Sequence, residues 1–87
     1  MSPTEDDIKA LVPKINGFLS EHSKWKDARC GEIGRLRYYD GLAWREKLCV
    51  LLVEVSPSEV GLQLAVAELI DKTEGFEGVE VDVRCEW

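Results

Sequence analysis

Six consecutive apolar residues, at positions 48–53, constrain the fold more than any other feature of this sequence. The run reads Leu-Cys-Val-Leu-Leu-Val and is bounded by charged residues, Lys47 on one side and Glu54 on the other. It is far shorter than the roughly 20 apolar residues that a membrane-spanning helix needs. A short apolar run with charged flanks is typical of a strand covered on both faces. It therefore predicts the central strand of a sheet.

Two further strands are predicted around this run. Residues 29–39 and 42–55 read as a β-hairpin, because Asp40-Gly41 between them tolerates the positive φ of a two-residue turn. Residues 79–87 alternate apolar and charged side chains, as a half-buried edge strand does. Pairing outward from a two-residue turn predicts three cross-strand pairs: Tyr39 with Leu42, Arg37 with Trp44, and Arg35 with Glu46.

Two helix starts have nearly the same sequence, Ser-Pro-Thr-Glu from Ser2 and Ser-Pro-Ser-Glu from Ser56. Each places Ser as the N-cap, Pro at the first helical position and Glu at the third. They predict one helix that ends at residues 20–22 and a second over residues 57–72. Pro13 lies inside the first helix and predicts a kink or break near Lys9, because its nitrogen has no hydrogen to donate.

These elements predict a single α+β domain over residues 1–87, in the order α-β-β-α-β. The architecture expected is a two-layer sandwich whose three-stranded sheet has its second strand in the centre. A crossover through the second helix lays the last strand parallel to that central strand. Both helices then cover one face of the sheet.

Composition narrows the expected location and chemistry. The acidic N-terminus lacks the basic and apolar stretches of a secretory signal, so we expect a cytoplasmic location. Cys30, Cys49 and Cys85 are an odd number at wide spacing, which predicts neither a disulfide framework nor a zinc site. The net charge is −6 and the chain has one histidine, His22, at the expected end of the first helix. We predict no catalytic residue, no metal ligand, no cofactor and no enzymatic activity.

An excess of apolar surface carries the functional prediction. A two-layer protein covers only one face of its sheet, yet residues 48–53 are apolar on both faces. Exposed apolar patches rimmed by charge mark interaction sites. The sequence therefore predicts a protein-interaction module, a small regulator, inhibitor or assembly subunit, that binds a protein partner or forms a homodimer and does not associate with membranes. The predicted binding face consists of residues in one strand phase and their neighbours: Arg37, Tyr39, Trp44, Leu48, Val50 and Leu52. The opposite phase is then expected to face the helices: Cys49, Leu51, Val53 and Val55.

Two alternatives remain open. Residues 35–45 mix Arg with Tyr and Trp, a composition that binds single-stranded nucleic acid by stacking and phosphate contact. Cys30 follows Arg29, and a neighbouring cation lowers the pKa of a thiol, which would favour thiol or metal chemistry at that residue.

Overall fold

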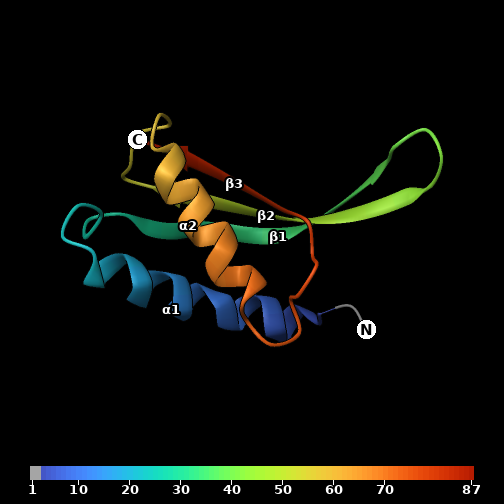
Figure 1. Ribbon diagram of the computed structural model, residues 1–87, viewed down its shortest axis with the longest axis horizontal. Coiled ribbons are helices and arrows are strands. Elements are labelled where there is room, and N and C mark those ends of the chain that lie inside the picture. The colour runs from blue at the N-terminus through green and yellow to red at the C-terminus, as the bar shows by residue number, and fades with distance from the viewer. Residues whose placement is uncertain (1–2) are drawn as a thin grey trace.

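The computed structural model describes residues 3–87 as two helices and three strands (Figure 1). In chain order these are α1 (Glu5–Glu21), β1 (Arg29–Tyr39), β2 (Trp44–Val53), α2 (Val60–Asp71) and β3 (Val81–Glu86). The sheet has the order β1-β2-β3, with β1 antiparallel and β3 parallel to the central strand β2. The predicted α+β class, element order and central strand are confirmed.

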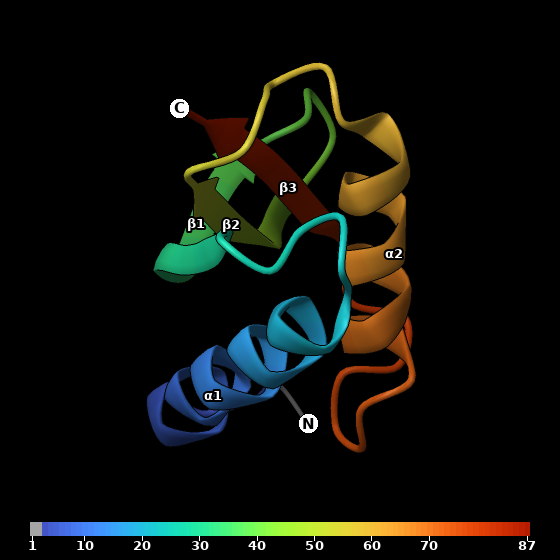
Figure 2. The ribbon, with the colours of Figure 1, turned by 90° about the vertical axis from the view of Figure 1, so that its left-hand side faces the viewer.

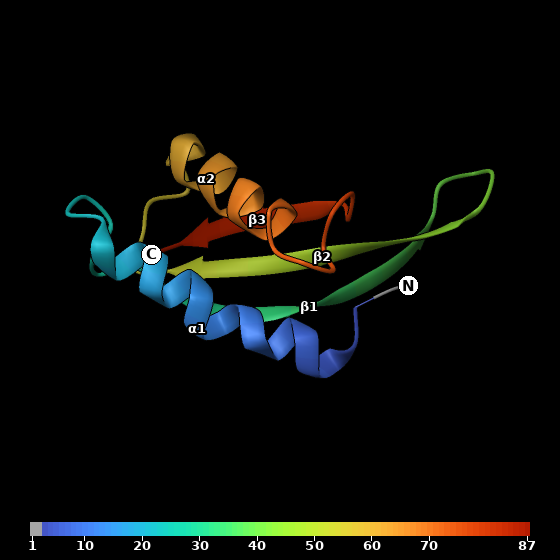
Figure 3. The same ribbon diagram turned by 60° about the horizontal axis from the view of Figure 1, so that its bottom comes forward.

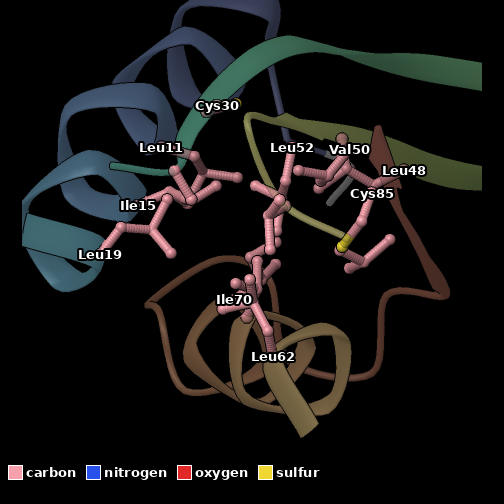
Figure 4. Close-up of a cluster of buried hydrophobic side chains, with 14 of the residues drawn as sticks. Leu11, Ile15, Leu19, Cys30, Leu48, Val50, Leu52, Leu62, Ile70 and Cys85 are labelled. Carbon is pink, nitrogen blue, oxygen red and sulfur yellow. The ribbon is translucent and has the colours of Figure 1, made fainter. Parts of the chain in front are cut away.

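Both helices lie on one side of the sheet, as the end-on view in Figure 2 shows. Helix α1 packs against β1 and α2 packs against β3, and alternate side chains of β2 (Leu48, Val50 and Leu52) are buried between the helices and the sheet. That space is filled by a continuous apolar core (Figure 4). Its fully buried side chains come from α1, β2 and α2: Leu11, Ile15, Leu19, Leu48, Val50, Leu52, Leu62, Val66 and Ile70.

Helix α1 begins at Glu5, two residues after Pro3, the predicted first helical residue. Its N-cap is Thr4, whose hydroxyl accepts the Asp7 N–H while the Asp7 carboxylate accepts the Thr4 N–H. The predicted cap at Ser2 lies outside the described residues. Of the kink or break predicted from Pro13, the break is wrong, since α1 is continuous from Glu5 to Glu21. Pro13 is exposed, and the buried stripe that includes Ile15 holds the turns on both sides of it against the sheet.

The second predicted cap is also wrong. Helix α2 starts at Val60, and its N-cap Glu59 makes no side-chain cap hydrogen bond. The Ser56 hydroxyl instead accepts the N–H of Ser58, at 3.2 Å. A Ser side chain that bonds the backbone two residues on forms a turn of its own. Residues 56–59 are therefore a turn that leads into α2 and not its first helical turn.

The hairpin loop has four residues, Asp40 to Ala43, and not two. The Asp40 carboxylate accepts the N–H groups of Leu42 and Ala43, each at 2.8 Å, and the Asp40 N–H bonds the Ala43 carbonyl. Gly41 takes up the positive φ, +96°. The expected pairing is thus shifted by two residues along β2. The observed pairs are Tyr39 with Trp44, Arg37 with Glu46, and Arg35 with Leu48.

The predicted choice of sheet face is wrong. Leu48, Val50 and Leu52 point into the core and are at most 2% exposed. The register with β3 explains this, because it places them beside Val81, Val83 and Cys85, which are the apolar phase of the edge strand. Residues 49, 51 and 53 lie on the opposite, uncovered face. Val55, just beyond the strand, is buried as expected.

A β-bulge at Gly31 interrupts the pairing of β1 with β2, between Cys30 and Glu32. A Cβ on Gly31 would lie only 2.8 Å from the Val53 Cγ1 atom, so the close approach of the two strands requires glycine here. The Cys30 N–H is donated to the Asn16 side-chain oxygen on α1, at 2.8 Å.

Within residues 3–87 no helix has the length and apolar character to cross a bilayer.

Candidate functional site

The hairpin projects well beyond the rest of the molecule. Strand β3 pairs with β2 only from Leu48 onward, so residues 36–47 form a two-stranded ribbon with no third strand beside it. We call residues 36–47 the arm. Figures 1 and 3 show the arm extending past the helices, where no other element covers it. A two-stranded ribbon in water is marginally stable, so its side chains must supply much of its order.

One side of the arm carries an aromatic and charged cluster. The rings of Tyr39 and Trp44 are tilted against each other with their centroids 5.5 Å apart. The Arg37 guanidinium lies over the Trp44 ring, 5.6 Å from its centroid, and its Nε is 4.0 Å from the Glu46 carboxylate. We call Arg37, Tyr39 and Trp44 the arm cluster. Aromatic and cation–π contacts of this kind stabilise cross-strand neighbours.

The other side of the arm attaches it to β3 and the residue before it. The Tyr38 hydroxyl donates a hydrogen bond of 2.6 Å to the Glu80 carboxylate, and this bond raises the pKa of Tyr38. The Lys47 ammonium is 3.6 Å from the Asp82 carboxylate and 5.6 Å from the Tyr38 ring centroid. These contacts fix the direction in which the arm leaves the sheet.

The tip of the arm is held by one acidic side chain. The Asp40 carboxylate accepts hydrogen bonds from two backbone N–H groups, and these bonds lower its pKa. An ion pair with Arg45 also lowers the pKa of Asp40. The loop is therefore ordered although its apolar residue Leu42 is 90% exposed.

Exposed apolar side chains concentrate on the arm. Seven large apolar side chains are exposed among residues 3–87, and four of them lie within these twelve residues. The four are Leu36, Tyr39, Leu42 and Trp44, with Tyr39 58% and Trp44 65% exposed. Such a concentration on an otherwise charged surface indicates a contact surface, whereas single exposed apolar residues need no explanation.

The structure brings together half of the predicted site. Arg37, Tyr39 and Trp44 meet in the arm cluster, because a register shift of two residues keeps the same side chains together on one side of the hairpin. Leu48, Val50 and Leu52 share that phase, but they lie under the helices and are closed to a partner. The sequence analysis missed Leu42, the most exposed apolar residue of the arm. A loop of four residues would have placed it at the tip.

A hollow of about 370 Å³ lies at the base of the arm. Its lining includes the core residues Ile8, Leu48 and Phe76, which are all at most 5% exposed, and the half-buried Val79. Six of its thirteen lining residues are charged: Arg35, Arg45, Glu46, Lys47, Glu77 and Glu80. The lining draws on both phases of β2, Glu46 and Leu48 in one and Arg45 and Lys47 in the other, so the hollow does not belong to the arm-cluster side alone.

The uncovered sheet face is less apolar than the sequence suggested. Its central residues Cys49, Leu51 and Val53 are only half exposed. Charged residues of β3 lie beside them, with Asp82 opposite Cys49 and Arg84 opposite Leu51. A shallow groove of about 780 Å³ crosses this face to the free edge of β1, but it contains no aromatic side chain.

The structure gives little support to chemistry at the cysteines or the histidine. Cys30 is buried, and burial raises the pKa of its thiol, which outweighs the effect expected from Arg29. Among residues 3–87 no group of three or more His, Cys, Asp and Glu side chains could hold a metal ion. His22 is exposed and its ring makes tilted contacts with those of Phe18 and Trp25, with centroid distances of 5.0 and 4.6 Å.

Comparison with known proteins adds no relative. No protein-family model, no curated protein and no solved structure matches this chain. Functional inference therefore rests on the arm, the hollow at its base and the sheet face.

Proposed function

We propose that this chain is a non-enzymatic protein-interaction module that binds its partner through the arm. The observation that carries the proposal is the arm cluster together with Leu42, exposed on a ribbon that has no third strand beside it. Trp, Tyr and Arg dominate the residues that contribute most to protein–protein binding. Burying them against a partner would also order a ribbon that is marginal on its own.

The charges of the arm favour a protein partner over nucleic acid. Its three cations, Arg37, Arg45 and Lys47, each lie within 4.0 Å of a carboxylate: Glu46, Asp40 and Asp82, respectively. Phosphate groups would have to compete with these carboxylates in a chain of net charge −6. Nucleic-acid binding through residues 35–45 is therefore the second candidate, supported by the aromatic and basic composition alone.

The proposal includes a role and a location. A small domain with a projecting contact element suits a regulator, an inhibitor or a subunit of an assembly. The three free thiols fit a reducing compartment, so we place the module in the cytoplasm.

Photo-crosslinking from the arm tip in the source cell tests the proposal. A benzophenone side chain at position 42 is expected to crosslink protein, whereas the same side chain at position 64 is not. Leu64 is the matched control because it is 67% exposed on α2, away from the arm. The Trp44→Ala substitution should remove the crosslink at position 42. Crosslinks to RNA or DNA would favour the second candidate, and no crosslink at position 42 would refute an arm contact.

A further inference from the structure

We propose that the chain has a second binding site, where an extended acidic segment of a partner protein pairs as an added strand with the outer edge of β1 at Ile33 and Arg35. Adding a strand to an open sheet edge is a recurrent mode of peptide recognition. The site goes beyond the proposed function, because it does not depend on contact with the arm.

The outer edge of β1 carries hydrogen-bonding groups that no strand uses. Within residues 3–87, β1 pairs with β2 alone. Arg35 lies opposite Leu48, whose N–H bonds the Glu80 carbonyl on the β3 side, at 2.8 Å. The two members of such an antiparallel pair point their backbone groups away from each other. The N–H and carbonyl of Arg35 therefore point outward, and those of Ile33, two residues earlier, do the same.

Helix α1 forms the opposite wall of a groove along this edge. Figure 2 shows α1 beside β1, at the side of the molecule away from α2. A hollow of about 420 Å³ lies between them, and its lining includes residues 33–35 of β1 together with Glu5, Ile8 and Lys9 of α1. Spacings of three and four residues place these α1 side chains on one stripe of the helix. An extended segment in the groove would thus have an open strand edge on one side and a helix on the other.

Asn16 shows how a ligand in the groove would bond. It lies on the same stripe of α1, and its side-chain oxygen accepts the Cys30 N–H at 2.8 Å. Cys30 is opposite Leu52, so its N–H points outward from β1 as those of Ile33 and Arg35 do. An amide oxygen therefore already bonds this edge at its bulge end. The carbonyl groups of an extended segment are acceptors of the same kind for the two N–H groups that follow.

The charges of the groove favour an acidic segment. Of its charged lining residues, Arg37 and Glu46 pair with each other. The others are two cations, Lys9 and Arg35, and one anion, Glu5. Among residues 3–87, neither of these cations has a carboxylate within 4.0 Å. Carboxylates of a partner segment would complement them, and a nucleic acid would offer phosphates but no N–H and carbonyl ladder.

Photo-crosslinking in the source cell tests the site. A benzophenone side chain at position 5 is expected to crosslink a protein, whereas the same side chain at position 14 is not. Glu5 and Lys14 are both exposed on α1, and nine residues apart they lie on opposite sides of the helix. The inference is overturned by no adduct at position 5, by equal adducts at both positions, or by an adduct only to nucleic acid or to a second copy of this chain.

Two substitutions at Arg35 separate an added strand from a side-chain contact. Arg35→Ala removes the cation and keeps the N–H, whereas Arg35→Pro removes both. Proline is tolerated at an outward N–H of an edge strand, so the fold should remain, which circular dichroism checks. The yield of the position-5 adduct should be at least about 5-fold lower for Arg35→Pro than for Arg35→Ala, the usual effect of one hydrogen bond. Equal yields in folded variants would contradict strand addition.

Hydrogen exchange of the purified wild-type adduct gives a second test that needs no proline. The Ile33 and Arg35 amides should exchange at least about 10-fold more slowly than in the free chain, and unchanged rates would contradict strand addition.

A matched pair of charge reversals tests the acidic character of the segment. Lys9→Glu should lower the adduct yield because it repels carboxylates, whereas Lys14→Glu, on the opposite side of α1, should not. Equal yields would rule out an acidic partner segment. A protein adduct at position 42 with none at position 5 would overturn this site alone, and the reverse result would refute the arm contact and leave this site in place.

Discussion

Asp40 determines the shape of the arm tip more than any other residue. Its carboxylate accepts the N–H groups of Leu42 and Ala43, so the chain turns over four residues where Asp-Gly alone predicts a turn of two. The difference arises from a side-chain hydrogen bond, which sequence patterns of hairpin turns do not specify. It changes which residues pair across the arm but not the side on which they lie, because the shift is an even number of residues.

The ionisation of Asp40 should be visible in the loop amides. Because the folded loop lowers the pKa of Asp40, it stabilises the ionised form. That contribution is present above the unfolded value of about 3.9 and is lost as the pH falls through the lower, folded value. In an NMR titration, the Leu42 and Ala43 amide shifts should therefore have a midpoint below about 3.9. A midpoint at or above that value would contradict the loop hydrogen bonds.

Among the elements, β2 shows why the sheet face could not be predicted. Residues 48–53 are apolar in both phases, so the alternation that normally identifies the buried side is missing. The buried side of β2 is determined by β3. The regular alternation of β3 fixes its own buried side, and the register places Val83 beside Val50. That register depends on how α2 and its connections span the sheet, and residue types along the chain do not reveal it.

Matched substitutions in β2 test the corrected face. Leu52→Ala removes a fully buried side chain and should lower the free energy of unfolding by about 2–5 kcal/mol. Leu51→Ala changes the same side chain on the uncovered face, where Leu51 is half-buried, and should cost less than about half as much. Urea unfolding of the two variants measures both values. Equal losses would mean that something covers the second face in solution.

The helix starts show a second limit of sequence patterns. Two nearly identical Ser-Pro-x-Glu segments behave differently, since Ser56 closes a turn while Thr4 caps α1. The existence and order of both helices follow from apolar spacing, which tertiary packing reinforces. Their first residues depend on which of several hydroxyl groups bonds which N–H, and small local energies decide that.

At the scale of the whole molecule, the chain divides into a packed body and an arm. The sequence predicted Arg37, Tyr39 and Trp44 as contact residues, because they lie in or beside one strand phase and have the composition of binding hot spots. The hollow at the base of the arm could not be predicted. Its lining residues, among them Ile8, Leu48 and Phe76, are far apart in the sequence and meet only through the fold.

This division predicts unequal hydrogen exchange along β1 and β2. On monomeric protein, backbone amides within the arm should exchange at least about 10-fold faster than paired amides at Val50 and Leu52, because the arm opens without unfolding the body. Mass spectrometry of peptides from residues 36–47 and 48–53 measures the two rates. Equal protection would show that the arm unfolds only together with the body.

The hydrogen bond between Asn16 and Cys30 has a consequence for behaviour at high concentration. An edge strand offers free N–H and carbonyl groups to any other chain, and such edges seed aggregation. At the bulge, the Asn16 side-chain oxygen already accepts the Cys30 N–H. The extra residue Gly31 breaks the regular spacing of the neighbouring backbone N–H and carbonyl groups. A colliding chain therefore finds no regular ladder at the bulge end of β1, and this end of the sheet resists fibril growth while the protein displays an aromatic arm at the other.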